Sequence, residues 1–124
     1  MEQNTGRKAE ILAANYLKER GYNILDRNFR KPWGELDIVA KRGAVIIFAE
    51  VKAAKNPSSG FEPELHMNRE KIIKLVRTAR TYLAQKNYGP NQGWQIDLIS
   101  VTFDSQKTSP DIRHYENIEI PTRF

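Results

Sequence analysis

Apolar residues recur with helical spacing in two stretches of the chain and form short strand-like runs in five others. The first stretch predicts a helix over about residues 6 to 20, with Thr5 as a cap before it and Gly21 as a stop after it. The second predicts a helix that Asn68 caps and that ends near residues 87 to 90. The residues expected to line the buried face of this second helix are Ile72, Val76, Ala79 and Leu83.

Five short runs, bounded by turn-forming residues, are typical of β-strands. They span residues 22–29, 35–41, 44–52, 94–103 and about 112–120. The third contains five consecutive apolar residues, so both of its faces should be covered, as in a central strand packed by helices. The order α-β-β-β-α-β-β therefore predicts one α/β domain over residues 1–124, with a central mixed sheet flanked by helices.

The composition fits one folded domain and narrows the chemistry. The 124 residues include 20 Lys and Arg against 15 Asp and Glu, a net charge of +5 that favours polyanionic partners such as nucleic acid. The absence of cysteine excludes disulfides, thiolate-bound zinc, iron–sulfur clusters and cysteine nucleophiles. The sequence has no apolar leader at its start and no apolar run long enough for a membrane span, which predicts a soluble, cytoplasmic protein without membrane partners.

Three charged residues interrupt the most apolar part of the chain: Asp37 in the second expected strand, and Glu50 and Lys52 at the end of the third. Residues two apart on a strand point to the same face, so Glu50 and Lys52 share one. Any even-length hairpin turn near Arg42-Gly43 brings Asp37 to that face as well. If these two residues are themselves the turn, Asp37 faces Phe48 and has Glu50 as a diagonal neighbour, ~7–8 Å away.

Such a cluster suits metal-assisted hydrolysis of a phosphodiester, because carboxylate oxygens hold Mg²⁺ and the metal activates water and neutralises developing charge. A lysine beside the metal can orient that water or help to deprotonate it. Glu10, on the apolar stripe of the first helix, is a fourth candidate because its carboxylate points toward the core or its edge. The alternatives are a structural ion-pair network for the strand residues, and for Glu10 a helix-edge position paired with solvent or a neighbouring arginine.

At these positions the sequence resembles the PD-(D/E)xK nuclease superfamily and, within it, the bacterial YraN family, which is related to archaeal Holliday-junction resolvases. The resemblance covers nearly the whole chain, and its most specific part is Gly-Glu-Leu-Asp at residues 34–37 followed by Glu-Val-Lys at residues 50–52. Two positions depart from the pattern. Leu36 stands where the superfamily name has proline, which is a common replacement, and Ala54 stands where YraN-like sequences continue with arginine.

The resemblance implies a restriction-endonuclease-like fold and a role for each member of the cluster. Asp37, Glu50 and the backbone carbonyl of Val51 would bind Mg²⁺, for which Mn²⁺ should substitute. Lys52 would position the attacking water. Glu10 would complete the site from the first helix, either as a further metal ligand or as an acid beside the metal.

Basic residues gather in two regions that are suited to a nucleic-acid backbone. The residues expected to contact phosphates are Lys71, Lys74 and Arg77 on the second helix, Arg27, Arg30 and Lys31 near the first hairpin, and Lys55, which lies one residue later than the missing arginine. The alternative for the helix is a solvated basic face. Trp33 beside the second cluster offers a surface on which a base could stack, although a packing role is the more common one for tryptophan.

Other polar positions carry weaker expectations. Residues 54–67 follow Lys52 and are rich in turn formers, which predicts a mobile surface loop that either orders over a bound strand or stays disordered. Asp97 lies in an apolar strand and is expected to pair with a lysine or arginine of the second helix. His66 and His114 lack a metal-ligand pattern and are expected to pack in the core or on the surface.

The sequence thus predicts a nucleic-acid-binding, Mg²⁺-dependent nuclease that acts on DNA, with branched DNA as one candidate substrate. A junction substrate would favour a homodimer, because two strands must be cut in a coordinated way. One alternative is a nuclease fold that binds nucleic acid without cutting it. A second alternative is a protein-interaction subunit whose charge cluster is structural.

Overall fold

The computed structural model describes residues 2–54 and 67–121, which form a five-stranded sheet and two helices. Residues 55–66 of the expected loop, including Lys55 and His66, lie outside the described residues. The element order α-β-β-β-α-β-β confirms the sequence prediction. The elements are α1 (Glu2–Glu19), β1 (Asn23–Lys31), β2 (Gly34–Arg42), β3 (Val45–Ala54), α2 (Arg69–Gln85), β4 (Trp94–Thr102) and β5 (Asp111–Tyr115).

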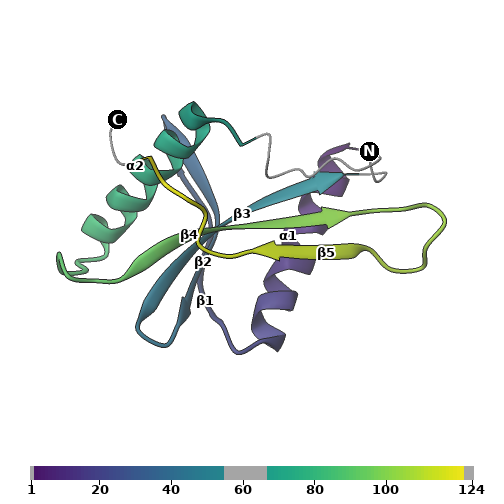
Figure 1. Ribbon diagram of the computed structural model, residues 1–124, viewed down its shortest axis with the longest axis horizontal. Helices are drawn as coiled ribbons and strands as arrows, with labels where there is room; N and C mark the ends of the chain where they lie inside the picture. The colour runs from purple at the N-terminus through teal and green to yellow at the C-terminus, as the bar shows by residue number, and fades with distance from the viewer. Residues whose placement is uncertain (1, 55–66, 122–124) are drawn as a thin grey trace.

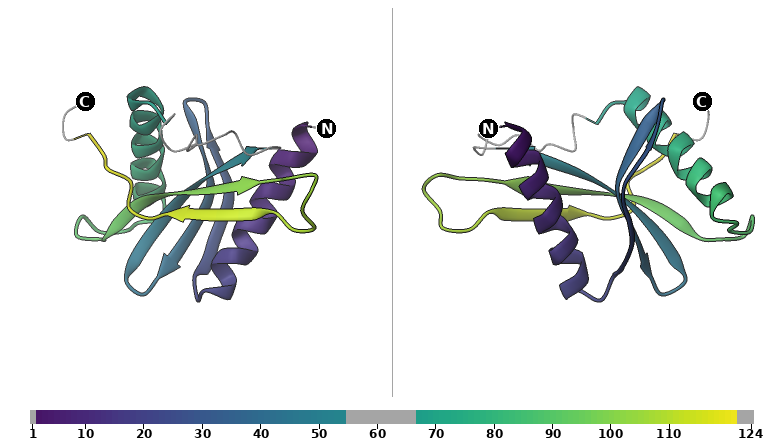
Figure 2. Two further views of the ribbon diagram at one scale, coloured as in Figure 1. Left: turned by 45° about the vertical axis from the view of Figure 1, so that its right-hand side comes forward. Right: turned by 180° about the vertical axis from the view of Figure 1, so that it is seen from behind.

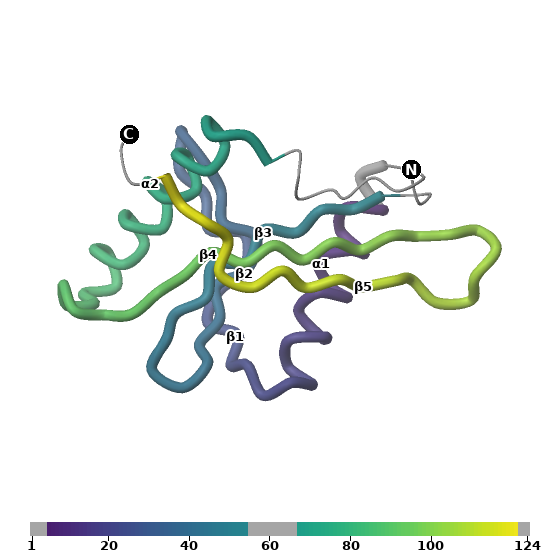
Figure 3. Tube along the Cα trace, in the orientation of Figure 1, coloured from purple at the N-terminus to yellow at the C-terminus, as the bar shows by residue number. Residues whose placement is uncertain are grey.

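The sheet is mixed, and its strands follow one another in space in the order β1-β2-β3-β4-β5. The first three strands form an antiparallel meander, β4 joins β3 in parallel, and β5 closes the sheet antiparallel to β4. The chain path shows how the connection through α2 brings β4 beside β3 (Figure 3). A parallel pair requires such a crossover, because its two strands run in the same direction.

The two helices cover opposite faces of the sheet, so the molecule has three layers (Figures 1 and 2). On the α1 side, small residues on the helix allow close approach to the sheet. This cluster includes Ala9, Ala13, Ala14 and Leu17 of α1 with Ile38, Ala40, Ile47, Ala49, Ile99 and Val101 of the strands. The alternating strand residues Val39, Ile46, Phe48, Ile96 and Leu98 belong to the other cluster, which packs against α2.

The buried face of α2 is wider than its apolar spacing indicates. Ile72, Val76 and Ala79 are buried as expected, Leu83 packs at the edge of the core, and Thr78 is also fully buried. Its other buried residues are Leu75 and Tyr82. Thr78 lies so close to Gly34 that a Cβ there would clash with the Thr78 hydroxyl oxygen. Glycine at the start of β2 therefore lets α2 lie directly against this end of the strand.

The second hairpin turns one residue later than the sequence indicates. Arg42 pairs with Val45, so the turn is Gly43-Ala44 and not Arg42-Gly43, and Gly43 has a φ of 60°, a conformation that glycine adopts at little cost. The register Ile38 with Ala49 follows from this turn. The shift changes which residues face one another but keeps the expected face of each side chain, because the loop length stays even.

Two element ends differ from the prediction. The first helix begins at Glu2, so Thr5 lies inside it and is not its cap; no glycine or proline interrupts residues 2–5, and glutamate is a good helix former. The last strand ends at Tyr115 and does not reach Ile120. Asn117 has a φ of 53°, which takes the backbone out of the extended conformation.

Neither helix within the described ranges is both long and apolar enough to cross a lipid bilayer.

Candidate active site where two strands diverge

The candidate site lies where β2 and β3 separate. Their pairing ends at Ile38 and Ala49, although both strands continue in the direction of the site. Beyond this point the Asp37 carboxylate accepts a hydrogen bond from the Val51 amide, with 2.8 Å between Oδ2 and N, and so takes the place of a ladder partner. We call this separation, lined by Asp37, Glu50 and Val51, the strand fork.

Two carboxyl groups meet at the strand fork with little access to water. Asp37 and Glu50 are each 8% exposed. Burial, followed by the charge of Glu50 and a hydrogen bond to it, raises the pKa of Asp37 to about 8, against the lowering effect of the Val51 amide. Near neutral pH the Asp37 carboxyl group therefore keeps its proton. The sequence prediction that Asp37 and Glu50 share a face is consistent with this contact.

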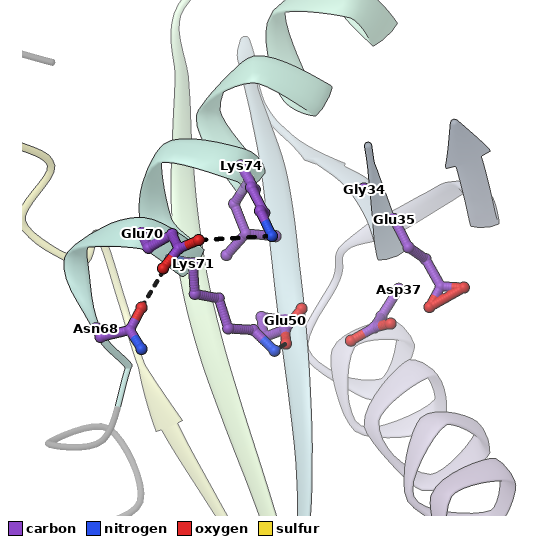
Figure 4. Close-up of a pocket in the computed structure, with 9 residues that line it drawn as sticks. Gly34, Glu35, Asp37, Glu50, Asn68, Glu70, Lys71 and Lys74 are labelled. Atoms are coloured by element: carbon purple, nitrogen blue, oxygen red, sulfur yellow. Dashed lines mark hydrogen bonds and ion pairs between the residues drawn. The ribbon is translucent and has the colours of Figure 1, made fainter. Parts of the chain in front are cut away.

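Two lysines accompany the carboxyl pair. Lys71 of α2 reaches down to β3, with 2.8 Å between its Nζ and Oε2 of Glu50 (Figure 4). Burial lowers the pKa of Lys71, but the hydrogen bond to Glu50 and the charge of that residue outweigh burial and raise it. The pKa of Lys52 is lowered by its burial first and by the charge of Lys71 second. Lys52 is thus the lysine that more readily gives up its proton.

An open pocket of about 410 Å³ lies over the strand fork between β2, β3 and the first turns of α2. Its lining residues are Gly34, Glu35, Asp37, Glu50, Asn68, Glu70, Lys71, Lys74 and Leu75. Figure 4 shows Lys71 extending from the helix to Glu50 on β3, while Lys74 pairs with Glu70 of the same helix. Asn68 caps the helix, and its side chain accepts a hydrogen bond from the Lys71 amide at 2.8 Å. The expected cap is therefore present, and it fixes the turn that carries the lysines.

Glu10 approaches the strand fork from the other face of the sheet, because α1 covers that face. Its carboxylate lies 4.0 Å from Arg27, and its side chain is 23% exposed, which matches the alternative of a helix-edge acid beside an arginine. Its charge nevertheless contributes to the raised pKa of Asp37. In residues 2–54 and 67–121 no group of three acidic or histidine side chains is placed to hold a metal ion, and the role of Glu10 as a further ligand stays a prediction.

The donors that remain at the strand fork fit a magnesium ion. In a strand, the N–H and C=O of one residue point to the same side, and the Val51 N–H points to Asp37. The Val51 carbonyl therefore faces the strand fork together with the carboxylates of Asp37 and Glu50. Mg²⁺ takes oxygen ligands, uses one or two carboxylates and keeps several waters. A dication would also counteract the burial and the Glu50 charge that raise the pKa of Asp37.

The basic residues expected to contact phosphates divide between two hollows. Lys71 and Lys74 line the pocket over the strand fork. Arg27 and Arg30 line a second hollow of about 550 Å³ between α1 and β1, together with Glu10. Its remaining lining residues are Gly6, Arg7, Ile11 and Asn28. The sequence analysis missed Arg7, which the helical spacing could have identified, because it lies one turn before Glu10 on the same helix face.

Two further basic residues lie against aromatic rings. The Lys31 ammonium is 5.3 Å from the centre of the Phe29 ring, and the Arg77 guanidinium is 4.3 Å from the centre of the Trp33 ring. Trp33 is half-buried, and its indole N–H is buried without a hydrogen-bond partner. The face that a nucleic-acid base would need is thus already covered by Arg77, which supports the packing role of Trp33.

Asp97 differs from its expected role. It is fully buried and pairs with His114 of β5, with 2.7 Å between Oδ2 and Nε2, and not with a basic residue of α2. Its other oxygen accepts hydrogen bonds from the side chain of Gln95 and from the amide of Asn117. The other ring nitrogen of His114 lies 3.3 Å from the Tyr16 hydroxyl. This network joins β4, β5 and α1, away from the strand fork.

The fold and site thus define an α/β protein with a buried carboxyl pair and two lysines at an open pocket. The family model described as "Uncharacterised protein family UPF0102" matches residues 9–101. A UPF0102 protein of Fervidobacterium nodosum is 40% identical over 89% of this chain and 77% of its own length. One of Clostridium acetobutylicum is 38% identical over 94% of both chains. The protein belongs to the UPF0102 family, also called the YraN family, as the sequence resemblance indicated.

Proposed function

We propose that this protein is a Mg²⁺-dependent nuclease that hydrolyses phosphodiester bonds in DNA. The observation that carries the proposal is the pair of buried carboxyl groups at the strand fork, Asp37 and Glu50, with Lys71 in contact with Glu50 and Lys52 further along β3. Two carboxyl groups buried side by side are costly to maintain, and such costs are characteristic of functional sites. The open pocket gives a phosphate access to the pair.

Each residue of the site has a distinct task in this proposal. Asp37, Glu50 and the Val51 carbonyl would hold Mg²⁺, which when bound supplies positive charge to the phosphate and lowers the pKa of water. Lys52 would orient the attacking water and take up its proton, a task that its lowered pKa favours. Glu10, on the other face of the sheet, would act through its charge on Asp37.

The substrate class is inferred from the net positive charge of the chain and from basic side chains on both sides of the site. The chain has a net charge of +5, and Lys71 and Lys74 stand at the pocket with Arg27 and Arg30 in the hollow on the α1 side. Phosphates of a nucleic-acid strand are the anions that such a distribution attracts, and binding should weaken steeply as salt rises. The departure at Ala54 removes one basic contact next to the site, which the lysines of α2 would replace.

The test is a cleavage assay with purified full-length protein on labelled four-way junction, flap, duplex and single-stranded DNA and on RNA. Each substrate is incubated with Mg²⁺, with Mn²⁺ and with EDTA, beside Lys52→Ala and the matched surface variant Lys18→Ala. We expect cutting that needs metal, is lost in Lys52→Ala and is unchanged in Lys18→Ala, whose side chain is exposed on α1. Cutting that persists in Lys52→Ala would refute the assignment of the site.

A second function is favoured by the contact between Lys71 and Glu50, which satisfies Glu50 without a metal. In this case the protein would hold nucleic acid on a nuclease fold without cutting it. Salt-sensitive binding of the same substrates, with no metal-dependent cleavage and no metal affinity, would support this second function. Negligible, salt-insensitive binding would refute both and favour a structural role for the cluster.

A further inference from the structure

Lys71 is in direct contact with one of the proposed metal ligands, although it belongs to a different layer of the fold. Its Nζ lies 2.8 Å from Oε2 of Glu50, and the Glu50 side chain is only 9% exposed. The contact therefore joins α2 to β3 across the pocket (Figure 4). It differs from the surface pairs of the molecule, because one of its members has lost almost all contact with water.

The helix cap and the buried neighbours of Lys71 fix its backbone in this position. Its amide donates to the Asn68 cap, so its backbone is fixed in the first turn of α2. The neighbouring Ile72 and Leu75 are buried in the core cluster on this face of the sheet. Lys74, one turn later, offers a direct comparison: its partner is Glu70, 3.9 Å away and 80% exposed, in an ordinary helix-surface pair.

The position of Lys71 conflicts with a metal at the strand fork. An ammonium at hydrogen-bond distance occupies an oxygen of Glu50, and two cations at one carboxylate repel each other strongly where water is scarce. A metal ion that binds Oε2 of Glu50 therefore takes the place of Lys71. The released side chain remains above the pocket, because its backbone is held by the helix cap.

From this arrangement we infer that Lys71 is the counter-ion of Glu50 in the metal-free protein, and that it binds a substrate phosphate when a metal ion takes its place at Glu50. Lys71 is thus a positioning residue that couples metal binding to phosphate binding. The inference rests on the proposed function and extends it to a residue of α2. Its ligand class is the phosphodiester backbone, for which a lysine ammonium is a suitable point charge.

The first test measures Mn²⁺ affinity by calorimetry, without nucleic acid, on full-length wild type, Lys71→Met, Lys71→Arg and Lys74→Met. Loss of the competing cation should lower the Mn²⁺ dissociation constant of Lys71→Met roughly fivefold, since a partly buried pair is worth about 1 kcal/mol. Lys71→Arg should restore the wild-type affinity. Lys74→Met, which removes a lysine of the same pocket without touching Glu50, should leave it unchanged.

The second test measures binding of a labelled DNA duplex by anisotropy, with and without Mn²⁺, in a Lys52→Ala background that is expected not to cut. Mn²⁺ should strengthen DNA binding several-fold in this background and should lose that effect when Lys71→Met is added. Equal Mn²⁺ affinity in wild type and Lys71→Met would overturn the inference while leaving the metal site in place. No Mn²⁺ affinity in wild type beyond that of Asp37→Asn would instead refute the proposed function.

Discussion

Replacing Asp37 with asparagine should make the metal-free protein more stable, although it removes a ligand from the proposed site. The pKa of Asp37 is about 8 in the folded protein and 3.8 in an unperturbed side chain. The folded state therefore binds a proton that the unfolded state releases, so stability falls as pH rises from about 4 to about 8. Each pH unit above 3.8 lowers the free energy of unfolding by about 1.36 kcal/mol. At pH 7 the loss therefore amounts to as much as ~4 kcal/mol.

Asparagine avoids this cost and keeps the local hydrogen bonds. Its side-chain oxygen can accept from the Val51 amide, as Oδ2 of Asp37 does, and its amide group can donate to Glu50. We expect Asp37→Asn to gain between about 1 and 4 kcal/mol at pH 7, which for a chain of this length raises the melting temperature by roughly 4 °C for each kcal/mol. The gain should shrink at pH 5.

The assay is thermal unfolding in EDTA at pH 5, 7 and 8, for wild type, Asp37→Asn and the control Asp111→Asn. Asp111 lies at the exposed end of β5, where it forms a surface ion pair with Lys107, so its replacement should leave the melting temperature unchanged. Addition of Mg²⁺ at pH 8 should stabilise the wild type and not Asp37→Asn. An Asp37→Asn protein that is less stable than wild type at pH 7 would refute the reasoning.

Three further predictions concern the packing around the site and the remote polar network. Gly34→Ala should lower the free energy of unfolding by about 1–3 kcal/mol, because the new Cβ overlaps the Thr78 hydroxyl. Adding Thr78→Ala should recover part of this loss in urea denaturation, and strictly additive losses would contradict the clash. Asp97→Asn should lower the free energy of unfolding by about 3 kcal/mol, because an amide group would face donors that now bind a carboxylate. An unchanged midpoint of urea denaturation would show that this hydrogen-bond network does not stabilise the fold. Lys52→Ala should lower the rate of cleavage much more than the affinity for Mn²⁺, and equal losses in both would show that Lys52 acts through the metal site alone.

The shared face of Asp37 and Glu50 could be predicted from the sequence, because it depends only on the two-residue period of a strand and an even-length turn. The exact neighbours could not. The turn lies at Gly43-Ala44, so Ile38 lies opposite Ala49, and the continuation of both strands puts Asp37 beside Glu50 and not diagonal to it. A single-residue shift in a turn is below what a pattern of apolar residues can specify.

Contacts between distant elements account for what the sequence did not indicate. Helical spacing placed Lys71 beside the apolar face of α2, but its contact with Glu50 depends on how the helix lies over β3. In the same way, Asp97 meets His114 only because β5 pairs with β4, and a strand register of this kind is not encoded in local spacing. β5 ends two residues before Asn117, which has a positive φ; asparagine adopts this conformation more readily than most residues, but its presence alone does not specify where a strand ends.

The hydrogen bond from the Val51 amide to Asp37 gives the strand fork a spectroscopic reporter. Most amides of the sheet donate to carbonyls of a neighbouring strand, whose chemistry does not change with pH or ligand. This amide donates to a carboxyl group that takes up a proton with a pKa of about 8. In a ¹⁵N-labelled sample its resonance should therefore move as Asp37 titrates, and one backbone peak would follow the protonation of the site without any change to the protein.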